Sequence, residues 1–111
     1  MGIELGAAWT LEGGAFMIVR MNGQFGAATQ FALRESFDWI TGPVTIDLRN
    51  ASLAAAALGE IMLLANRIGI RNVTLANPAP ITRKILSVTH LDRVLRVTAV
   101  GDVSEEYQKS A

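Results

Sequence analysis

Residues 44–69, VTIDLRNASLAAAALGEIMLLANRIG, restrict the fold of this chain more than any other stretch. The alternation in residues 44–48 predicts a short strand, and residues 49–52 are typical of a turn. Four consecutive alanines, residues 54–57, then begin a helix rich in strong helix formers, and Gly69 can end it in a left-handed conformation. The strongly polar side chains of this helix are Glu60, Asn66 and Arg67. A helix so apolar around its circumference is either deeply buried or presented to a partner.

Length and composition narrow the class of protein. We expect a single domain over residues 1–111, because a chain of this size supports one hydrophobic core. Ten Lys and Arg balance ten Asp and Glu, so no overall field attracts nucleic acid or an anionic membrane. The chain has no cysteine, its N-terminus lacks a signal-peptide pattern, and its central apolar run is too short to span a bilayer. These features favour a cytoplasmic protein without membrane insertion, and the hydrophobic content of 50% favours an apolar surface for a protein partner.

Two strands and a helix are predicted before the strand that begins at residue 44. Residues 3–11 and 15–21 are predicted to form a hairpin through a turn at residues 12–14, and Asn22 and Gly23 are predicted turn residues. A helix is predicted over residues 28–40. Its predicted core face carries Leu33, Phe37 and Ile40. Its predicted polar face carries Gln30, Arg34 and Asp38.

The C-terminal half continues the alternation of strands and helices. A strand is predicted over residues 71–76, and Pro80 suits the first turn of the next helix, where its missing N–H is not needed. That helix is predicted to bury Ile81, Ile85 and Leu86 and to expose Arg83 and Lys84. A last strand is predicted over residues 95–99 and a short helix over residues 104–109. The sequence therefore predicts an α/β fold with a mixed, mostly parallel sheet of four to five strands, an N-terminal hairpin and about four helices.

Three segments in this order resemble the STAS domain, the fold of the anti-sigma-factor antagonists. MNGQFGAATQFALRE, residues 21–35, resembles the family's V-x-G-E-L-D-x-x-T-x-x-x-L-R-E opening, and VTIDLRNAS resembles its strand before the switch loop. LANPAPITRKILSVTHLDRVLRV, residues 75–97, is similar to the stretch L-V-N-P-S-P-x-V-R-R-x-L-x-x-T-G-L-D-x-L. The resemblance covers about residues 15–107 and implies a bacterial STAS-like domain.

The chain departs from the family at its switch. The family's helix begins D-S-S-G-L-G, and a kinase that is also the binding partner phosphorylates the second serine. With Leu58 and Gly59 as anchors, residues 54–57 stand where D-S-S-G would stand, one residue is lost upstream, and Ala56 takes the place of the phosphorylated serine. Gly26 also replaces the acidic residue that follows G-E-L in the family. The resemblance thus implies a degenerate, non-phosphorylatable member.

Ser52 is the hydroxyl closest to the lost site. We interpret it as a turn or N-cap residue, with a displaced phosphorylation site as the alternative. The alanine run is either a high-propensity helix start or a surface that another backbone can approach closely.

Catalytic and metal chemistry find little support in the residues. His90 is the one histidine, and its spacing from Asp47, Ser52 and Ser87 does not suggest a triad, so we interpret it as a loop residue. One histidine without cysteines makes no metal-ligand set. Arg83 and Lys84 could join Arg93 or Arg96 in an anion-binding patch, but a solvated helix face is the preferred interpretation. We therefore expect neither an enzyme nor a cofactor.

The leading hypothesis is a non-catalytic interaction module that resembles an anti-sigma-factor antagonist. Its partner would be a kinase-type anti-sigma factor, bound in transcription regulation without the usual phosphorylation switch. The alternatives are a STAS subunit of a bacterial lipid-transport ABC complex and a self-associating structural STAS domain, as a homodimer through the hairpin or the alanine face. The predicted partner-binding residues are Asn50, Ser52, Leu53, Ala54, Ala55, Ala56, Ala57, Leu58 and Met62.

Overall fold

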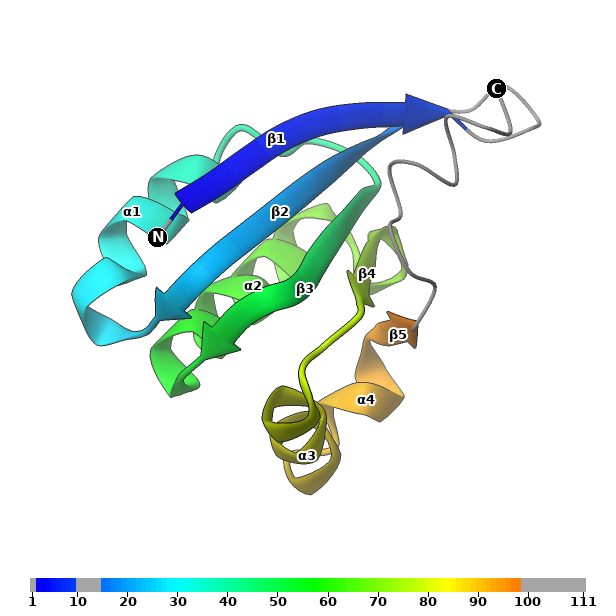
Figure 1. The fold of residues 1–111 in the computed structure, drawn as a ribbon. Helices are drawn as coiled ribbons and strands as arrows, with labels where there is room; N and C mark the ends of the chain where they lie inside the picture. Colours follow the sequence, from blue (N-terminus) through cyan, green and yellow to red (C-terminus); the bar gives the residue numbers. More distant parts are fainter. Residues whose placement is uncertain (1, 10–14, 99–111) are drawn as a thin grey trace.

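A five-stranded sheet with helices on one face and at one end forms the part of the computed structural model that is described, residues 2–9 and 15–98 (Figure 1). The strands are β1 (Gly2–Trp9), β2 (Ala15–Phe25), β3 (Val44–Leu53), β4 (Val73–Ala76) and β5 (Arg96–Thr98). The helices are α1 (Gln30–Phe37), α2 (Ala55–Ile68), α3 (Pro80–Val88) and α4 (Leu91–Val94), with 3-10 turns η1 (Ala27–Thr29) and η2 (Ile70–Asn72). In Figure 1, α1 and α2 lie behind the strands, and α3 and α4 lie below β4.

The strands lie in the sheet in sequence order, β1-β2-β3-β4-β5. β1 and β2 are antiparallel, and each later strand lies parallel to the one before it. The predicted α/β class, with a mixed and mostly parallel sheet, an N-terminal hairpin and four helices, is confirmed. None of the described helices is long and apolar enough to span a membrane.

The core lies between the sheet and the helices. Val19, Ile46 and Leu75 form one row across β2, β3 and β4, and each is 0% exposed. Burial of an aliphatic side chain of this size contributes about 1.5–3 kcal/mol. The predicted core residues of the first helical segment, Leu33, Phe37 and Ile40, are all buried, although α1 itself ends at Phe37.

β2 and β3 are both longer than predicted. The predicted turns at residues 22–23 and 49–52 are wrong, because both segments are strand and pair with each other. Arg20 pairs with Asp47 and Asn22 with Asn50, so one residue of β2 lies opposite two of β3. Pairing resumes beyond this β-bulge, through residues that usually form turns, and Gly23 takes a φ of 108° within the strand.

The predicted core face of α3 is confirmed for Leu86 and in part for Ile85, but it is wrong for Ile81. Pro80 begins the helix as predicted, but Ile81 is 65% exposed, whereas Thr82 and Leu86 are fully buried and Ile85 is partly buried. The reason is helical geometry: Thr82 and Leu86, four residues apart, share the side that meets the core, and Ile81 lies away from it.

The remaining C-terminal elements differ from the prediction in length. The predicted strand at residues 71–76 begins only at Val73, after η2, and the last described strand covers Arg96–Thr98. α4 was not predicted; His90 precedes it, exposed and with a φ of 61°. The predicted turn at residues 12–14 and helix at residues 104–109 lie outside the described residues.

Candidate protein-binding site

The candidate site lies where β3 passes into α2. Ser52, Ala54 and Ala55 are exposed there and Ala56 is half-buried, and we call these four residues the lip. The lip lies at the carboxyl ends of β2 and β3, which end side by side because Phe25 pairs with Leu53. In open α/β sheets, ligands bind outside the carboxyl ends of the strands.

Backbone hydrogen bonds hold the lip in place. The amide of Ala54 donates to the carbonyl of Phe25 at 2.8 Å, and the carbonyl of Ala54 accepts from the amides of Ala57 (3.0 Å) and Leu58 (3.2 Å). Ala54 therefore joins the end of β2 to the first turn of α2. Its methyl side chain cannot cap the helix, so no side chain at the N-cap accepts from the first amides of α2.

Gly26 brings the segment after β2 close to the lip. A Cβ atom at this position would lie 3.2 Å from the Cβ of Ala54, which is tight for two carbon atoms. The amide of Gly26 donates to Oγ1 of Thr29 at 3.0 Å, and that hydroxyl donates to the carbonyl of Gly26 at 3.2 Å. A tight turn thus begins η1 directly beside the start of α2.

An open groove of about 480 Å³ runs between these two segments. Residues 24–29 form one wall and residues 52–54 form the other. Small residues dominate both walls, among them Gly26, Ala27, Ala28 and Ala54. Small side chains in both walls allow the backbone of another protein to approach closely.

The structure divides the nine predicted partner-binding residues into two groups. Three belong to the core: Leu53 is 4%, Ala57 0% and Leu58 6% exposed. Their inclusion is corrected, because in β3 and in the first turn of α2 these positions face the sheet and helices rather than solvent. The remaining six are exposed or half-buried: Asn50, Ser52, Ala54, Ala55, Ala56 and Met62. That they bind a partner stays a prediction.

Ser52 and Ala56 occupy different kinds of position. Ser52 lies within β3, opposite Gln24, and is exposed on the face of the sheet away from α1 and α2. Its hydroxyl has no hydrogen-bond partner among the described residues. Ala56 lies in the first turn of α2 and carries only a methyl group. The hydroxyl nearest in sequence therefore lies in a strand, not at the helix start.

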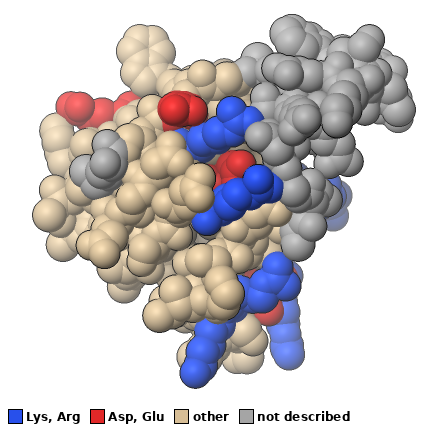
Figure 2. Space-filling view, in the orientation of Figure 1, with Lys and Arg blue, Asp and Glu red and all other residues tan. Residues whose placement is uncertain are grey.

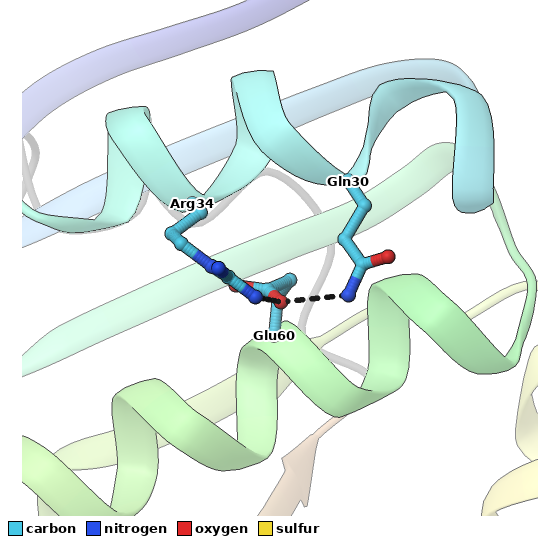
Figure 3. A network of polar contacts seen from close by, with 3 residues as sticks. All are labelled: Gln30, Arg34 and Glu60. Atoms are coloured by element: carbon cyan, nitrogen blue, oxygen red, sulfur yellow. Dashed lines mark hydrogen bonds and ion pairs between the residues drawn. The ribbon is translucent and has the colours of Figure 1, made fainter.

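A buried carboxylate joins α2 to α1 behind the lip (Figure 3). Arg34 donates from Nε to Oε1 of Glu60 at 3.0 Å and from Nη2 to Oε2 at 2.9 Å, and Gln30 donates to Oε2 at 3.0 Å. The side chain of Glu60 is 2% exposed and that of Arg34 is 52% exposed. The hydrogen bonds from Arg34 and then Gln30 lower the pKa of Glu60 to about 2, against the opposing effect of burial.

A second contact ties the same two helices together. Nη2 of Arg67, near the end of α2, donates to the carbonyl of Phe37 at the end of α1 at 2.7 Å. α1 is thus attached to α2 near both of its ends.

The role of Glu60 was not predicted from the sequence. A single acidic residue in an apolar helix was the available signal, together with Gln30 and Arg34, which stand four residues apart and so share a face of α1. These residues define how α1 docks on α2.

Basic side chains gather over α3 and α4. Figure 2 shows Lys and Arg over α3 and α4 at the bottom of the view, and basic and acidic side chains mixed over the sheet. Arg83, Lys84, Arg93 and Arg96 are all exposed, as expected for a solvated face. No group of three His, Asp or Glu side chains in the described part of the chain could hold a metal ion.

The chain resembles known proteins in both sequence and fold. It is 28% identical over 91 residues to a STAS-domain containing protein of Pseudomonas aeruginosa (strain UCBPP-PA14), a match that covers 77% of this chain and 90% of that protein. No protein-family model matches the chain.

Solved structures with this fold include anti-sigma factor antagonists. One from Mycobacterium paratuberculosis has a TM-score of 0.75 at 17% identity, over 95% of this chain and 92% of that one. A proposed antagonist from Thermotoga maritima has a TM-score of 0.72 at 19% identity, over 86% of each chain. The unphosphorylated form of SpoIIAA has a TM-score of 0.66 at 14% identity, over 97% and 96%. The predicted resemblance is confirmed: this chain has the STAS fold and is related in sequence to a STAS-domain protein.

Proposed function

We propose that this protein is a non-catalytic interaction module that binds a kinase-type anti-sigma factor through the lip and is not switched off there by phosphorylation. The observation that supports this proposal best is the lip itself, a solvent-open surface of small residues at the start of α2 in which Ala56 offers no hydroxyl. The neighbours named as anti-sigma factor antagonists share this fold.

The physical reason for a permanent binding state is electrostatic. A phosphate would add nearly two negative charges to an apolar contact surface, and desolvation of those charges opposes association. A free helix start would otherwise stabilise such an anion, since its amides and dipole favour negative charge. With alanine at residues 54–57, no phosphate can be attached at these positions.

Affinity capture from the native cell tests the identity of the partner. The wild-type chain should retain a kinase-type anti-sigma factor, which mass spectrometry would identify. Recovery of the ATPase of a lipid-transport complex would instead support the transport subunit and reject the proposal.

Substitutions that introduce a negative charge test whether the lip is the surface that contacts the partner. Ala55→Asp and Ala56→Asp should weaken the captured complex at least tenfold, about 1.4 kcal/mol, because they put an unpaired charge in the contact. Asn66→Asp is the matched control, since Asn66 is exposed on the same helix about 15 Å further along. Unchanged affinity in both lip variants would reject this surface.

Incubation with the captured kinase and ATP tests whether the protein is phosphorylated. The wild-type chain should gain no phosphate at residues 54–57, while Ala56→Ser restores a hydroxyl at the family position. A phosphate on Ser52 of the wild-type chain would show that the switch has moved rather than been lost.

A further inference from the structure

The outer edge of β1 is open in the part of the chain that the structure describes. β1 pairs with β2 and with no other described strand, and it forms the border of the sheet in Figure 1. It is eight residues long, which is more than the usual five or six. The backbone groups of this edge that point away from β2 therefore have no strand partner within the described chain.

Within the described residues, β1 has few of the features that normally protect an edge strand. Proteins block such edges with proline, lysine, a bulge or a very short strand. β1, GIELGAAW, has neither proline nor lysine, its pairing with β2 runs from Gly2 to Trp9 without a register shift, and Glu4 is its one charged residue. The opposite edge differs: β5 has three residues, one of them the exposed Arg96.

An exposed aliphatic side chain lies on this edge. Leu5 pairs directly with Val19, so both point to the helix side of the sheet. Val19 is fully buried, whereas Leu5 is 48% exposed, because the sheet ends there. A further strand beside β1 would cover Leu5 and continue the apolar row that runs through Val19 and Ile46.

We propose that β1 pairs with β1 of a second copy of this chain, antiparallel about a twofold axis perpendicular to the sheet. Such an axis keeps the helices of both copies on the same side and joins two five-stranded sheets into one of ten strands. Pairing centred on Gly6 places Leu5 opposite Ala7 and Glu4 opposite Ala8 of the other copy.

Charge does not oppose a second copy as the occupant. In this register Glu4 faces a small uncharged residue, so the two glutamates do not meet. The formal net charge of the chain is +0, so two copies do not repel each other at long range. The proposal is independent of the proposed function, because β2 separates β1 from β3 and the lip.

Sedimentation and light scattering over a wide concentration range test the proposal. The wild-type mass should rise from 11.9 kDa towards twice that value. Leu5→Lys, which places a charge at the edge, should raise the dissociation constant at least tenfold. The matched control Ile81→Lys, at a similarly exposed aliphatic residue on α3, should leave the dissociation constant unchanged.

Hydrogen exchange on the wild-type chain gives a readout that needs no variant. The β1 amides that point away from β2 should become protected as concentration rises. A monomer at every concentration would overturn the proposal, as would a dimer that leaves these amides unprotected or that is lost with Ile81→Lys but kept with Leu5→Lys.

Discussion

Arg34 of α1 holds both carboxylate oxygens of Glu60 of α2, with Nε and Nη2 at 3.0 and 2.9 Å. This two-point contact fixes the distance and the rotation between the helices, which a single hydrogen bond would not. It also requires an ionised carboxylate in a nearly closed site, so the charge state of Glu60 and the docking of α1 depend on each other.

Glu60→Gln should destabilise the fold at neutral pH. The amide keeps the shape of the side chain but loses the charge that Arg34 binds. We expect a loss of about 1 kcal/mol in the free energy of unfolding, below the about 1.5–3 kcal/mol of a charged hydrogen bond because Arg34 is half exposed. Urea unfolding measures it. Glu35→Gln, at an exposed position of α1, is the control and should change little.

The stabilisation by Glu60 should depend on pH in the acid range. Its pKa is about 2 in the fold against an ordinary value of 4.5, so the folded state favours the ionised form. The stabilisation is therefore complete above about pH 4.5 and is lost as the pH falls towards 2. The difference in unfolding free energy between wild type and Glu60→Gln should shrink over this range. A difference that stays constant down to pH 2 would contradict the assignment.

Thr82→Val should stabilise the protein. Oγ1 of Thr82 is buried and has no hydrogen-bond partner among the described residues. Folding therefore removes this hydroxyl from water without forming a hydrogen bond to replace those it made with water, and this destabilises the folded state. Valine has nearly the same shape, and we expect a gain of about 1 kcal/mol by urea or thermal unfolding. Thr89→Val is the contrast: the hydroxyl of Thr89 donates to the carbonyl of Ile85 at 2.8 Å, so its removal should not stabilise.

Gly59→Ala should also stabilise, through the helix itself. Gly59 is exposed on α2, and a Cβ there would meet no atom within 4 Å. Alanine restricts the unfolded chain and favours the helix, which should add about 0.5–1 kcal/mol. Loss of stability would mean that α2 is less regular at this point than the structure shows.

Gly26→Ala should destabilise the protein. The added methyl group would lie 3.2 Å from the Cβ of Ala54, so the start of η1 or the lip must move by a few tenths of an ångström. We expect a loss of up to about 1 kcal/mol in the free energy of unfolding. Unfolding of Gly26→Ala and Gly59→Ala side by side compares the same substitution in a tight and in an open site.

Periodicity predicted the elements well where local preference and tertiary packing agree. Leu33 and Phe37 on α1, the alanine-rich α2 and Pro80 at the start of α3 follow directly from spacing and propensity. The errors come from packing over distance. Asn22 and Gly23 favour a turn in isolation, yet pairing with β3 keeps them in a strand.

That the predicted partner-binding residues bind a partner stays a prediction. The sequence placed them at residues 50–58 and Met62, yet it could not show that Leu53, Ala57 and Leu58 face the core. Whether an apolar residue in the first turn of a helix is buried depends on where the neighbouring strand ends. On α3, Ile81 was predicted to be buried but is 65% exposed, whereas the polar Thr82 is fully buried.

The bulge between β2 and β3 has a consequence for chain length. Leu48 and Arg49 together lie opposite Met21, so β3 carries one residue more than its neighbour requires. Beyond that point the inward positions are Ala51 and Leu53 and the outward ones are Asn50 and Ser52, the same order that a regular strand without Arg49 would give. The bulge therefore accommodates the extra residue without turning Asn50 and Ser52 to the helix side of the sheet, so the outward face that leads into the lip is preserved.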